Sequence, residues 1–297
     1  MIANQTAAAP CCSANSAAPA LISGDDRAQF ALLASHAQII GDAPPAGTPV
    51  FRASNDTETS QYLRAEGAFL LSDRWQVGAG FPLVRRHLNR PGVDSTRISL
   101  GDLRMSAAYE VLPEWEYSFY KPKAYFFSQW ILPTGKSIYE SADPRGVEAT
   151  GQGFWTFATG ILLLKKWRFC DSYFMPELHY SLERTFNHSS AAESVSVSPG
   201  FGASAPIGIG YSPGAGSIRI GSRLQPTYAS SKRVRSNIGE SYTSKQLSWD
   251  LSLELGWVIE ENWSLNASYT DQTVIGPAMG TTLSRSVALS LQHRWPR

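Results

Sequence analysis

The stretch KQLSWDLSLELGWVI (Lys245–Ile259) alternates between two kinds of side chain. Every second residue from Leu247 to Ile259 is leucine, tryptophan or isoleucine, whereas the residues between them, as far as Gly256, are polar or glycine. A repeat of two residues places two such sets on opposite faces of a β-strand. The stretch is also longer than the strands of soluble sandwiches, which commonly have about 5–6 residues. It therefore predicts a long strand with one apolar and one polar face.

The same alternation returns along the chain, and convincing amphipathic helices are absent from it. No run approaches the ~18 apolar residues that a membrane-spanning helix needs. Two stretches, 124–132 and 154–164, are apolar on both faces, so alternation does not show which face points inward. Twelve strands are predicted, at 28–40, 61–71, 75–86, 98–111, 122–133, 154–165, 172–186, 195–211, 218–230, 245–259, 263–270 and 285–295.

The connections between these strands are alternately short and long, which puts all the short turns at one end of the sheet. An up-and-down barrel of the outer membrane has this arrangement, with short periplasmic turns and longer outer loops. A strand of ~10–12 residues, tilted by about 40°, spans the roughly 25 Å apolar band of such a barrel. The short links lie at 72–74, 113–116, 165–167, 212–217 and 260–262; the long links lie at 41–60, 87–97, 134–153, 187–194, 231–244 and 275–284.

These patterns predict an all-β fold, a single up-and-down antiparallel transmembrane β-barrel of about 12 strands. The barrel is expected over residues 26–297, and residues 1–25 are expected to be an N-terminal tail or a plug in the lumen. A soluble all-β fold is the alternative. It would need two sheets that share a dry core, whereas the second face here is rich in Ser, Gly, Asn, Asp and Glu, which suits a wet lumen.

Composition excludes several other classes of protein. The net charge is +1, so nucleic acid is not an expected partner, and only 17% of the 297 residues are charged. Cys11, Cys12 and Cys170 form neither a metal-site pattern nor a disulfide framework, and no cofactor or metal is predicted. The first twenty residues lack a signal-peptide pattern, so either the chain is not exported or the numbering begins near the mature end.

Tryptophans gather beside the short links and at the C-terminus. Aromatic residues favour the boundary between lipid and water, so this clustering predicts a girdle at one end of the barrel. Its members are Trp75, Trp115, Trp167, Trp257, Trp263 and Trp295. The last strand is expected to pair with the first and to end at Trp295, the part read by the outer-membrane assembly machinery. Pro296 and Arg297 are expected to be a two-residue overhang, because proline cannot extend a ladder.

Charged residues on the predicted inner face suggest a selectivity region. A single register that sets Arg223 opposite Asp250 also sets Arg219 opposite Glu254, so two cross-strand ion pairs are predicted in the lumen. Their role is either to neutralise each other inside a narrow barrel or to sort permeants by charge. Further inward candidates are Arg64, Glu66, Arg86, Asp102, Arg104, Glu110, Glu177, His179 and Glu183, with Arg64, Glu66, Arg104 and Glu177 chosen as lumen residues.

Enzymatic activity is not predicted. His179 and Ser181 lie two residues apart on the predicted lumen face of one strand, with backbones ~6.5–7 Å apart, which is a poor distance for a nucleophile and its base.

Four stretches resemble a known family: LSDRWQVGAGFPLVRR (71–86), GDLRMSAAYEV (101–111), WILPTGKS (130–137) and TGQGFWTFATGILLLKKW (150–167). They are similar to outer-membrane transporters of the phenol-degradation meta-pathway type. In that family a strand ending in Pro-Thr-Gly precedes a long loop and a glycine-rich return. The resemblance covers roughly 60–290 and implies a transporter or channel for small solutes, including apolar or aromatic ones. It assigns no binding residues.

The sequence as a whole predicts a passive channel in the bacterial outer membrane. Its expected partners are membrane lipid, a small-molecule permeant and the assembly machinery, and its oligomeric state is left open. The alternative is a structural or adhesive barrel with a closed lumen. A lipid-modifying outer-membrane enzyme is the third hypothesis.

Overall fold

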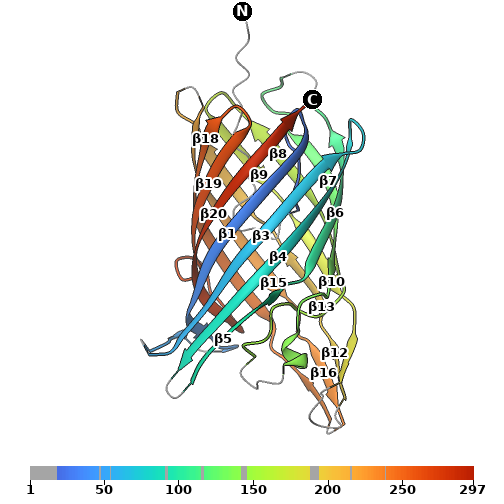
Figure 1. Cartoon of the computed structure of the whole chain (residues 1–297), viewed down its shortest axis with the longest axis vertical. Coiled ribbons are helices and arrows are strands. Elements are labelled where there is room, and N and C mark those ends of the chain that lie inside the picture. The colour runs from blue at the N-terminus through green and yellow to red at the C-terminus, as the bar shows by residue number, and fades with distance from the viewer. Residues whose placement is uncertain are drawn as a thin grey trace, which may run out of the picture.

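The sheet closes on itself because its first and last strands pair. In the computed structural model, β1 (Asp26–Ala43) runs antiparallel to β20 (Thr281–Pro296), with Ala34 opposite Leu289 (Figure 1). Closure satisfies the edge groups of both strands, which is what lipid demands of a spanning sheet. The structure describes residues 19–46, 48–53, 55–90, 93–114, 117–141, 146–187, 194–214, 216–237 and 239–297.

The predicted twelve-stranded antiparallel barrel is confirmed. Seven strands are single elements, namely β1, β3 (Thr57–Leu70), β4 (Trp75–Arg90), β7 (Lys123–Leu132), β8 (Thr156–Lys166), β19 (Trp263–Asp271) and β20. The other five are β5 (Val93–Leu100) with β6 (Leu103–Leu112); β9 (Cys170–Phe174) with β10 (Glu177–Ser181) and β11 (Arg184–Asn187); β12 (Ser194–Ser198) with β13 (Gly200–Ser204) and β14 (Ile207–Tyr211); β15 (Ile218–Ala229) with β16 (Arg233–Ser236); and β17 (Gly239–Tyr242) with β18 (Gln246–Glu260).

Prolines account for some of the interruptions without displacing the strands. Pro176 separates β9 from β10, but Phe174 lies opposite Leu163 and Glu177 opposite Gly160, so the register against β8 is the same on both sides. A proline removes one ladder hydrogen bond and leaves its carbonyl free to accept. Ile161 N–H indeed donates to the carbonyl of Pro176 at 3.1 Å. The stretch expected as one strand therefore remains one strand of the wall.

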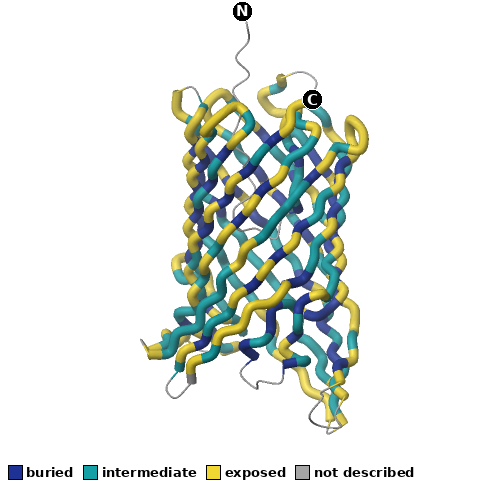
Figure 2. The backbone as a smooth tube through the Cα atoms, in the orientation of Figure 1, coloured by how far each residue is buried: buried dark blue, intermediate teal, exposed yellow. Residues whose placement is uncertain are grey.

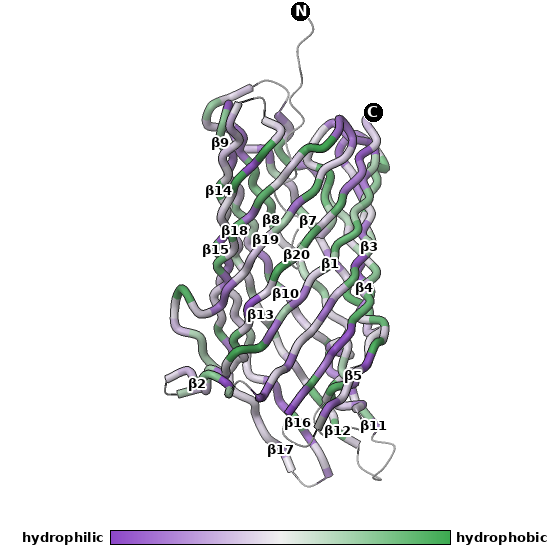
Figure 3. Tube along the Cα trace, turned by 60° about the vertical axis from the view of Figure 1, so that its left-hand side comes forward, coloured by the Kyte–Doolittle hydropathy of each residue, from purple (hydrophilic) through white to green (hydrophobic). Residues whose placement is uncertain are grey.

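Burial alternates along many of the spanning strands, as Figure 2 shows. On β18, Leu253, Leu255 and Trp257 are exposed on the outside, whereas Ser252 and Glu254 are buried on the inside. Figure 3 shows the corresponding alternation in hydropathy. In a membrane barrel the outward side chains face lipid and the inward ones face the lumen.

Tryptophans occur toward both ends of the barrel. Trp75, Trp257, Trp263 and Trp295 are exposed near the short turns, at the end that carries the C-terminus (Figure 1), and Trp167 lies in the turn after β8. Trp115 lies outside the described residues. The sequence pattern missed a second set toward the opposite end, Trp130, Trp155 and Trp249. That the first set forms a membrane-boundary girdle stays a prediction.

Two expectations about chain segments need correction. Pro296 belongs to β20 and lies opposite Asp26, so Arg297 alone extends past the strand. Proline fits this position because it is the end of the ladder, where one missing donor costs little. The expected long links at 187–194 and 231–244 include paired strands, because β11, β12, β16 and β17 form a four-stranded sheet beyond the barrel. Hairpins that extend past the membrane satisfy their backbone groups by pairing.

That outer sheet carries exposed charged residues. Hydrogen bonds from Tyr242 Oη and Arg235 Nε hold the pKa of Glu240 below its usual value.

Within the described residues the only helix is the single turn η1 (Ile138–Glu140), and no helix there is long and apolar enough to span a membrane.

Candidate functional site in the barrel lumen

Four of the charged residues chosen from the sequence gather inside the barrel. Arg64 and Glu66 point inward from β3, and their Nε and Oε1 atoms are 2.6 Å apart. Arg104 of β6 interacts electrostatically with both of them and with Glu177 of β10. Glu66 and Arg104 also line one small internal cavity of about 10 Å³. Three separate regions of sequence thus contribute to a mixed-charge cluster in the lumen.

A second cluster centres on Arg219 of β15. Its guanidinium binds both carboxylate oxygens of Asp171, with Nη2–Oδ1 and Nε–Oδ2 distances of 2.7 and 2.8 Å, and its Nη1 lies 3.1 Å from Glu254 Oε2. Arg223 Nη1 lies 3.7 Å from Glu254 Oε1. The two arginine side chains are 4% and 2% exposed, so both cations are buried and compensated. Asp171 was not chosen from the sequence.

The register expected for this cluster was wrong by two residues. Arg223 lies opposite Ser252 and Arg219 opposite Gly256, so the Arg219–Glu254 pair is diagonal rather than direct. Asp250 lies opposite Gln225 and accepts a hydrogen bond from Gln272 Nε2 at 2.7 Å, instead of pairing directly with Arg223. A shift of two residues leaves every side chain on its original face, so alternation is blind to it.

Glycines on the inner face of β13 and β14 make room for the large side chains of neighbouring strands. A Cβ atom at Gly210 would lie 2.5 Å from Arg219 Nε, and one at Gly202 would lie 2.2 Å from His179 Nε2. The neighbouring side chains therefore lie flat against bare backbone. This close approach explains why glycine stands at 202, 208 and 210 on the inner face of β13 and β14.

The two sides of the lumen differ in chemistry. Inward residues of β6 to β9 and the Met175 that follows form a buried apolar cluster of Ala108, Tyr125, Phe127, Leu162, Tyr173 and Met175. Half a turn around the barrel, β18 to β20 turn hydroxyl and amide groups inward, including Ser252, Ser264, Asn266, Ser268, Ser290 and Gln292. We call these the aromatic strip and the hydroxyl strip. The aromatic strip explains why 124–132 and 154–164 are apolar on both faces.

Residues 19–23 lie inside the barrel near the short turns. Ile22 is buried, its N–H donates to Gln76 Oε1 at 2.6 Å, and Gln76 Nε2 donates back to the Ile22 carbonyl at 3.2 Å. Lys123 Nζ donates to the carbonyl of Ser23, and Leu21 packs against the aromatic strip. Gln29 Nε2 of β1 also donates to the Leu21 carbonyl at 3.0 Å, so side chains of β4, β7 and β1 hold this segment. We propose that it acts as a lumen plug.

Replacing Gln76 with leucine is expected to loosen this segment. The change keeps the side-chain volume but leaves the buried N–H and carbonyl of Ile22 without partners, at a cost of about 1–3 kcal/mol for each group. Thiol labelling of a cysteine placed at Ser23, with the three natural cysteines replaced by serine, should become at least about tenfold faster. Gln38→Leu, an outward-facing change on β1, serves as the matched control, and equal labelling rates in both variants would contradict the assignment.

A loop folds against the inner wall at the opposite end. Asp102, at the break between β5 and β6, accepts hydrogen bonds from the N–H groups of Gly135 and Gln152 at 3.0 and 2.6 Å. Thr150 Oγ1 donates to the Leu100 carbonyl, and inward-facing Arg86 donates to the carbonyl of Ala149. We call the described residues 133–141 and 146–153 the inner loop. It contains the Pro-Thr-Gly segment.

Ser181 and His179 are not arranged as a nucleophile and its base. Ser181 Oγ lies 2.7 Å from Thr156 Oγ1, and His179 Nδ1 lies 3.9 Å from Glu177 Oε1. No hydrogen bond joins Ser181 to His179 in the described part of the chain, although a nucleophile needs its base at that distance. Among the same residues, no group of three or more His, Cys, Asp or Glu side chains is placed to hold a metal ion.

Comparison with known proteins finds structures with a similar fold but no related sequence. No family model matches the chain, and no curated protein matches its sequence. The COG4313 outer membrane channel from Pseudomonas putida F1 is similar in structure, with a TM-score of 0.70 and 11% identity over 93% of this chain and 97% of that one. The transport unit of the autotransporter AIDA-I from Escherichia coli has a TM-score of 0.51 and 9% identity, over 92% of each chain.

At these identities the likeness concerns the fold alone. The first structure is an outer membrane channel and the second a transport unit, and the present chain, a closed antiparallel sheet, shares their fold. Its outward side chains are apolar and its inward ones are largely polar, as the lipid-facing band of such barrels requires. The protein is therefore an outer-membrane β-barrel, and its location is the bacterial outer membrane.

Proposed function

We propose that this barrel is a passive channel for small amphipathic solutes, including aromatic ones. The observation that carries the proposal is the two-sided lumen, in which the aromatic strip of β6 to β9 faces the hydroxyl strip of β18 to β20. A solute with an apolar ring and one polar group keeps favourable contacts on both sides. A purely apolar or a strongly hydrated solute loses one set of contacts.

Charge adds little discrimination in this proposal. Arg64 is balanced by Glu66, and Arg219 is balanced by Asp171 and Glu254. Paired charges of both signs present no ring of one sign, and rings of one sign are what give cation or anion preference. The solute gradient supplies the driving force. We propose these residues as lumen-shaping groups whose balance favours neutral permeants.

Several polar atoms of the hydroxyl strip lack a partner. Ser264 Oγ, Asn266 Nδ2 and Gln292 Oε1 are buried without a hydrogen-bond partner in the described part of the chain. Donors and acceptors that line a passage and stay unpaired can bond transiently to a passing solute. Their position on the hydroxyl strip matches the polar group of an amphipathic permeant.

Solute uptake into vesicles tests the proposal. Liposomes carrying the purified chain are expected to take up phenol faster than glucose, relative to empty liposomes. Asn266→Leu removes part of the hydroxyl strip and should slow phenol uptake several-fold, because one neutral hydrogen bond contributes about 1 kcal/mol. Leu265→Ala, which changes the lipid-facing neighbour on β19, is the matched control and should leave uptake unchanged.

A structural barrel with a closed lumen is the competing function. The plug residues around Ile22 and the inner loop held by Asp102 both occupy space inside the wall, and this observation favours it. Folded, heat-modifiable protein that leaves liposomes impermeable to every small solute tested would support the closed barrel and reject the channel.

A further inference from the structure

The outer wall changes from apolar to polar within three rows of side chains near the long loops. The first row, Leu289, Ala34, Leu63 and Leu83, runs across β20, β1, β3 and β4. The next contains Val287, His36, Gln61, Arg85 and Ile98, and the third contains Arg285, Gln38, Thr59, His87 and Thr96. The middle row therefore marks the level at which the lipid-facing band gives way to headgroups.

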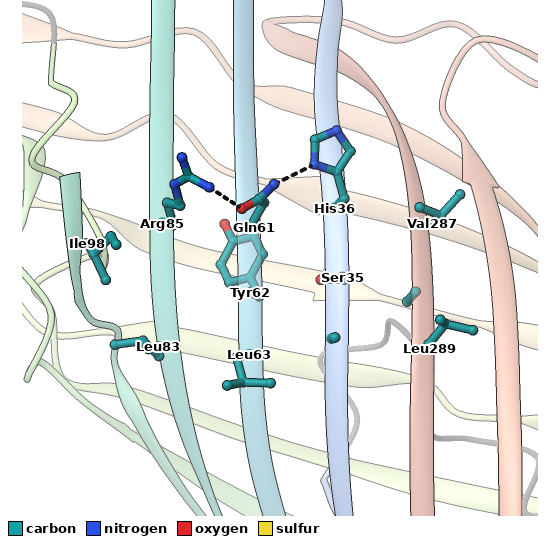
Figure 4. A pocket seen from close by; sticks show the side chains of 12 residues that line it. Ser35, His36, Gln61, Tyr62, Leu63, Leu83, Arg85, Ile98, Val287 and Leu289 are labelled. Atoms are coloured by element: carbon teal, nitrogen blue, oxygen red, sulfur yellow. Dashed lines mark hydrogen bonds between the residues drawn. The ribbon is translucent and has the colours of Figure 1, made fainter. Parts of the chain in front are cut away.

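A depression crosses the wall at this level. Ala34 is a small residue between larger ones, and the hollow around it has a volume of about 470 Å³. Figure 4 shows Arg85, Gln61 and His36 in one row, with Leu83, Leu63 and Leu289 below the row and Ile98 and Val287 to its left and right. Its apolar lining includes Ala34, Leu63, Leu83, Ile98, Val287 and Leu289. Such a hollow accepts part of an acyl chain.

The polar side of the hollow is a hydrogen-bonded row across three strands. Arg85 Nη1 donates to Gln61 Oε1 at 3.2 Å, and Gln61 Nε2 lies 3.3 Å from His36 Nδ1 (Figure 4). Arginine has donors only, so Gln61 must turn its oxygen toward Arg85 and its NH₂ toward His36. His36 Nδ1 then accepts, which puts the ring proton on Nε2. The row offers donors, and no acceptor of its own, to a ligand at either end.

Arg85 also differs from neighbouring cations in its pairing. Arg285 lies 2.8 Å from Asp271, and His87 lies 3.5 Å from Asp94. Arg85 forms no ion pair within the described residues and donates a hydrogen bond to the neutral Gln61. A cation at the edge of the lipid band, beside an apolar hollow, is complementary to an anionic headgroup with an acyl chain attached.

We propose that this part of the wall, centred on Arg85, Gln61, His36 and Ala34, binds lipopolysaccharide. A lipid A phosphate accepts hydrogen bonds from Arg85, His36 offers a further donor to the same headgroup, and one acyl chain occupies the hollow at Ala34. The long loops place this site in the outer leaflet, where the phosphorylated lipid of the outer membrane resides. Phosphate fits because it is an anion with acceptor oxygens, which a donor-only row requires.

Binding of purified rough lipopolysaccharide to the whole barrel in detergent tests this site. Arg85→Gln is expected to weaken binding about tenfold or more, because hydrogen bonds to charged groups contribute about 1.5–3 kcal/mol. Arg74→Gln removes one exposed cation in a short turn at the other end of the barrel and should bind as the wild type does. Equal affinities of the two variants would overturn the proposal.

Binding of other lipids, and of lipopolysaccharide to a second variant, shows which part of lipopolysaccharide the site recognises. Enzymatically dephosphorylated lipid A and phosphatidylglycerol are both expected to bind more weakly than lipopolysaccharide, and inorganic phosphate in millimolar amounts should not displace it. Equal binding of dephosphorylated lipid A would overturn the phosphate contact, and equal binding of phosphatidylglycerol would overturn the choice of lipid. Ala34→Trp fills the hollow from the lipid side and leaves Arg85 in place. It should also weaken binding several-fold, and unchanged binding would reject the acyl-chain seat even if the Arg85 variant fails to fold.

Discussion

Replacing Arg219 with leucine is expected to lower the free energy of unfolding by about 3–5 kcal/mol, because removal of one partner from a buried ion pair leaves an uncompensated charge. Arg219 holds Asp171 by two hydrogen bonds and Glu254 by a third, and its side chain is 4% exposed. After the change, Glu254 keeps only the longer contact with Arg223, and Asp171 loses both of its bonds from Arg219. Urea unfolding in lipid vesicles, followed by tryptophan fluorescence, measures the change.

Two further variants show whether the uncompensated buried charge causes the loss of stability in Arg219→Leu. Arg235→Leu breaks an exposed pair with Glu240 in the outer sheet and should leave the unfolding free energy nearly unchanged. Adding Glu254→Gln to Arg219→Leu should recover part of the loss, because it removes one of the two stranded carboxylates. If Arg219→Leu and Arg235→Leu were equally stable, the cluster would contribute no more than a surface pair.

Strand positions and faces were predictable because lipid imposes one rule on the whole outer wall. Each spanning strand must turn apolar side chains outward, so alternation in 245–259 identified both the strand and its faces, which β18 shows. The same rule placed four charged residues on the lumen face, where the structure has them: Arg64, Glu66, Arg104 and Glu177. Alternation carries no information on partners along the strand, and for this reason the register at Arg223 and Asp250 was wrong by two residues.

Other features depend on contacts that are remote in sequence. The apolar inner faces of 124–132 and 154–164 pack with each other and with Leu21, which lies about a hundred residues away from the first of them. Asp171 lay one residue outside the expected strand at 172–186, although it shares the parity of the inward Tyr173. Arg85 carried a usable signal, because a cation on an otherwise lipid-facing strand marks the headgroup level.

Replacing Asp102 with alanine is expected to release the inner loop and to raise conductance. The carboxylate accepts the N–H groups of Gly135 and Gln152, and a buried donor without a partner costs about 1–3 kcal/mol. Loss of two such bonds shifts a two-state loop equilibrium by a factor of about 10 or more toward the released state. Single-channel recording in planar bilayers should therefore show larger or more frequent openings than in the wild type.

Gly151 offers an independent way to disturb the same contact. A Cβ atom there would lie 2.2 Å from Asp102 Oδ1, so Gly151→Ala should push the loop away from an intact carboxylate and also raise conductance. In the Asp102→Ala background this clash is absent, so the double variant should open no more than Asp102→Ala alone. Asp250→Asn, a change on β18 at a carboxylate that accepts its hydrogen bond from Gln272, is the control. Wild-type conductance in both folded loop variants would mean that the inner loop does not limit passage, and the constriction would then have to be sought at the Ile22 segment.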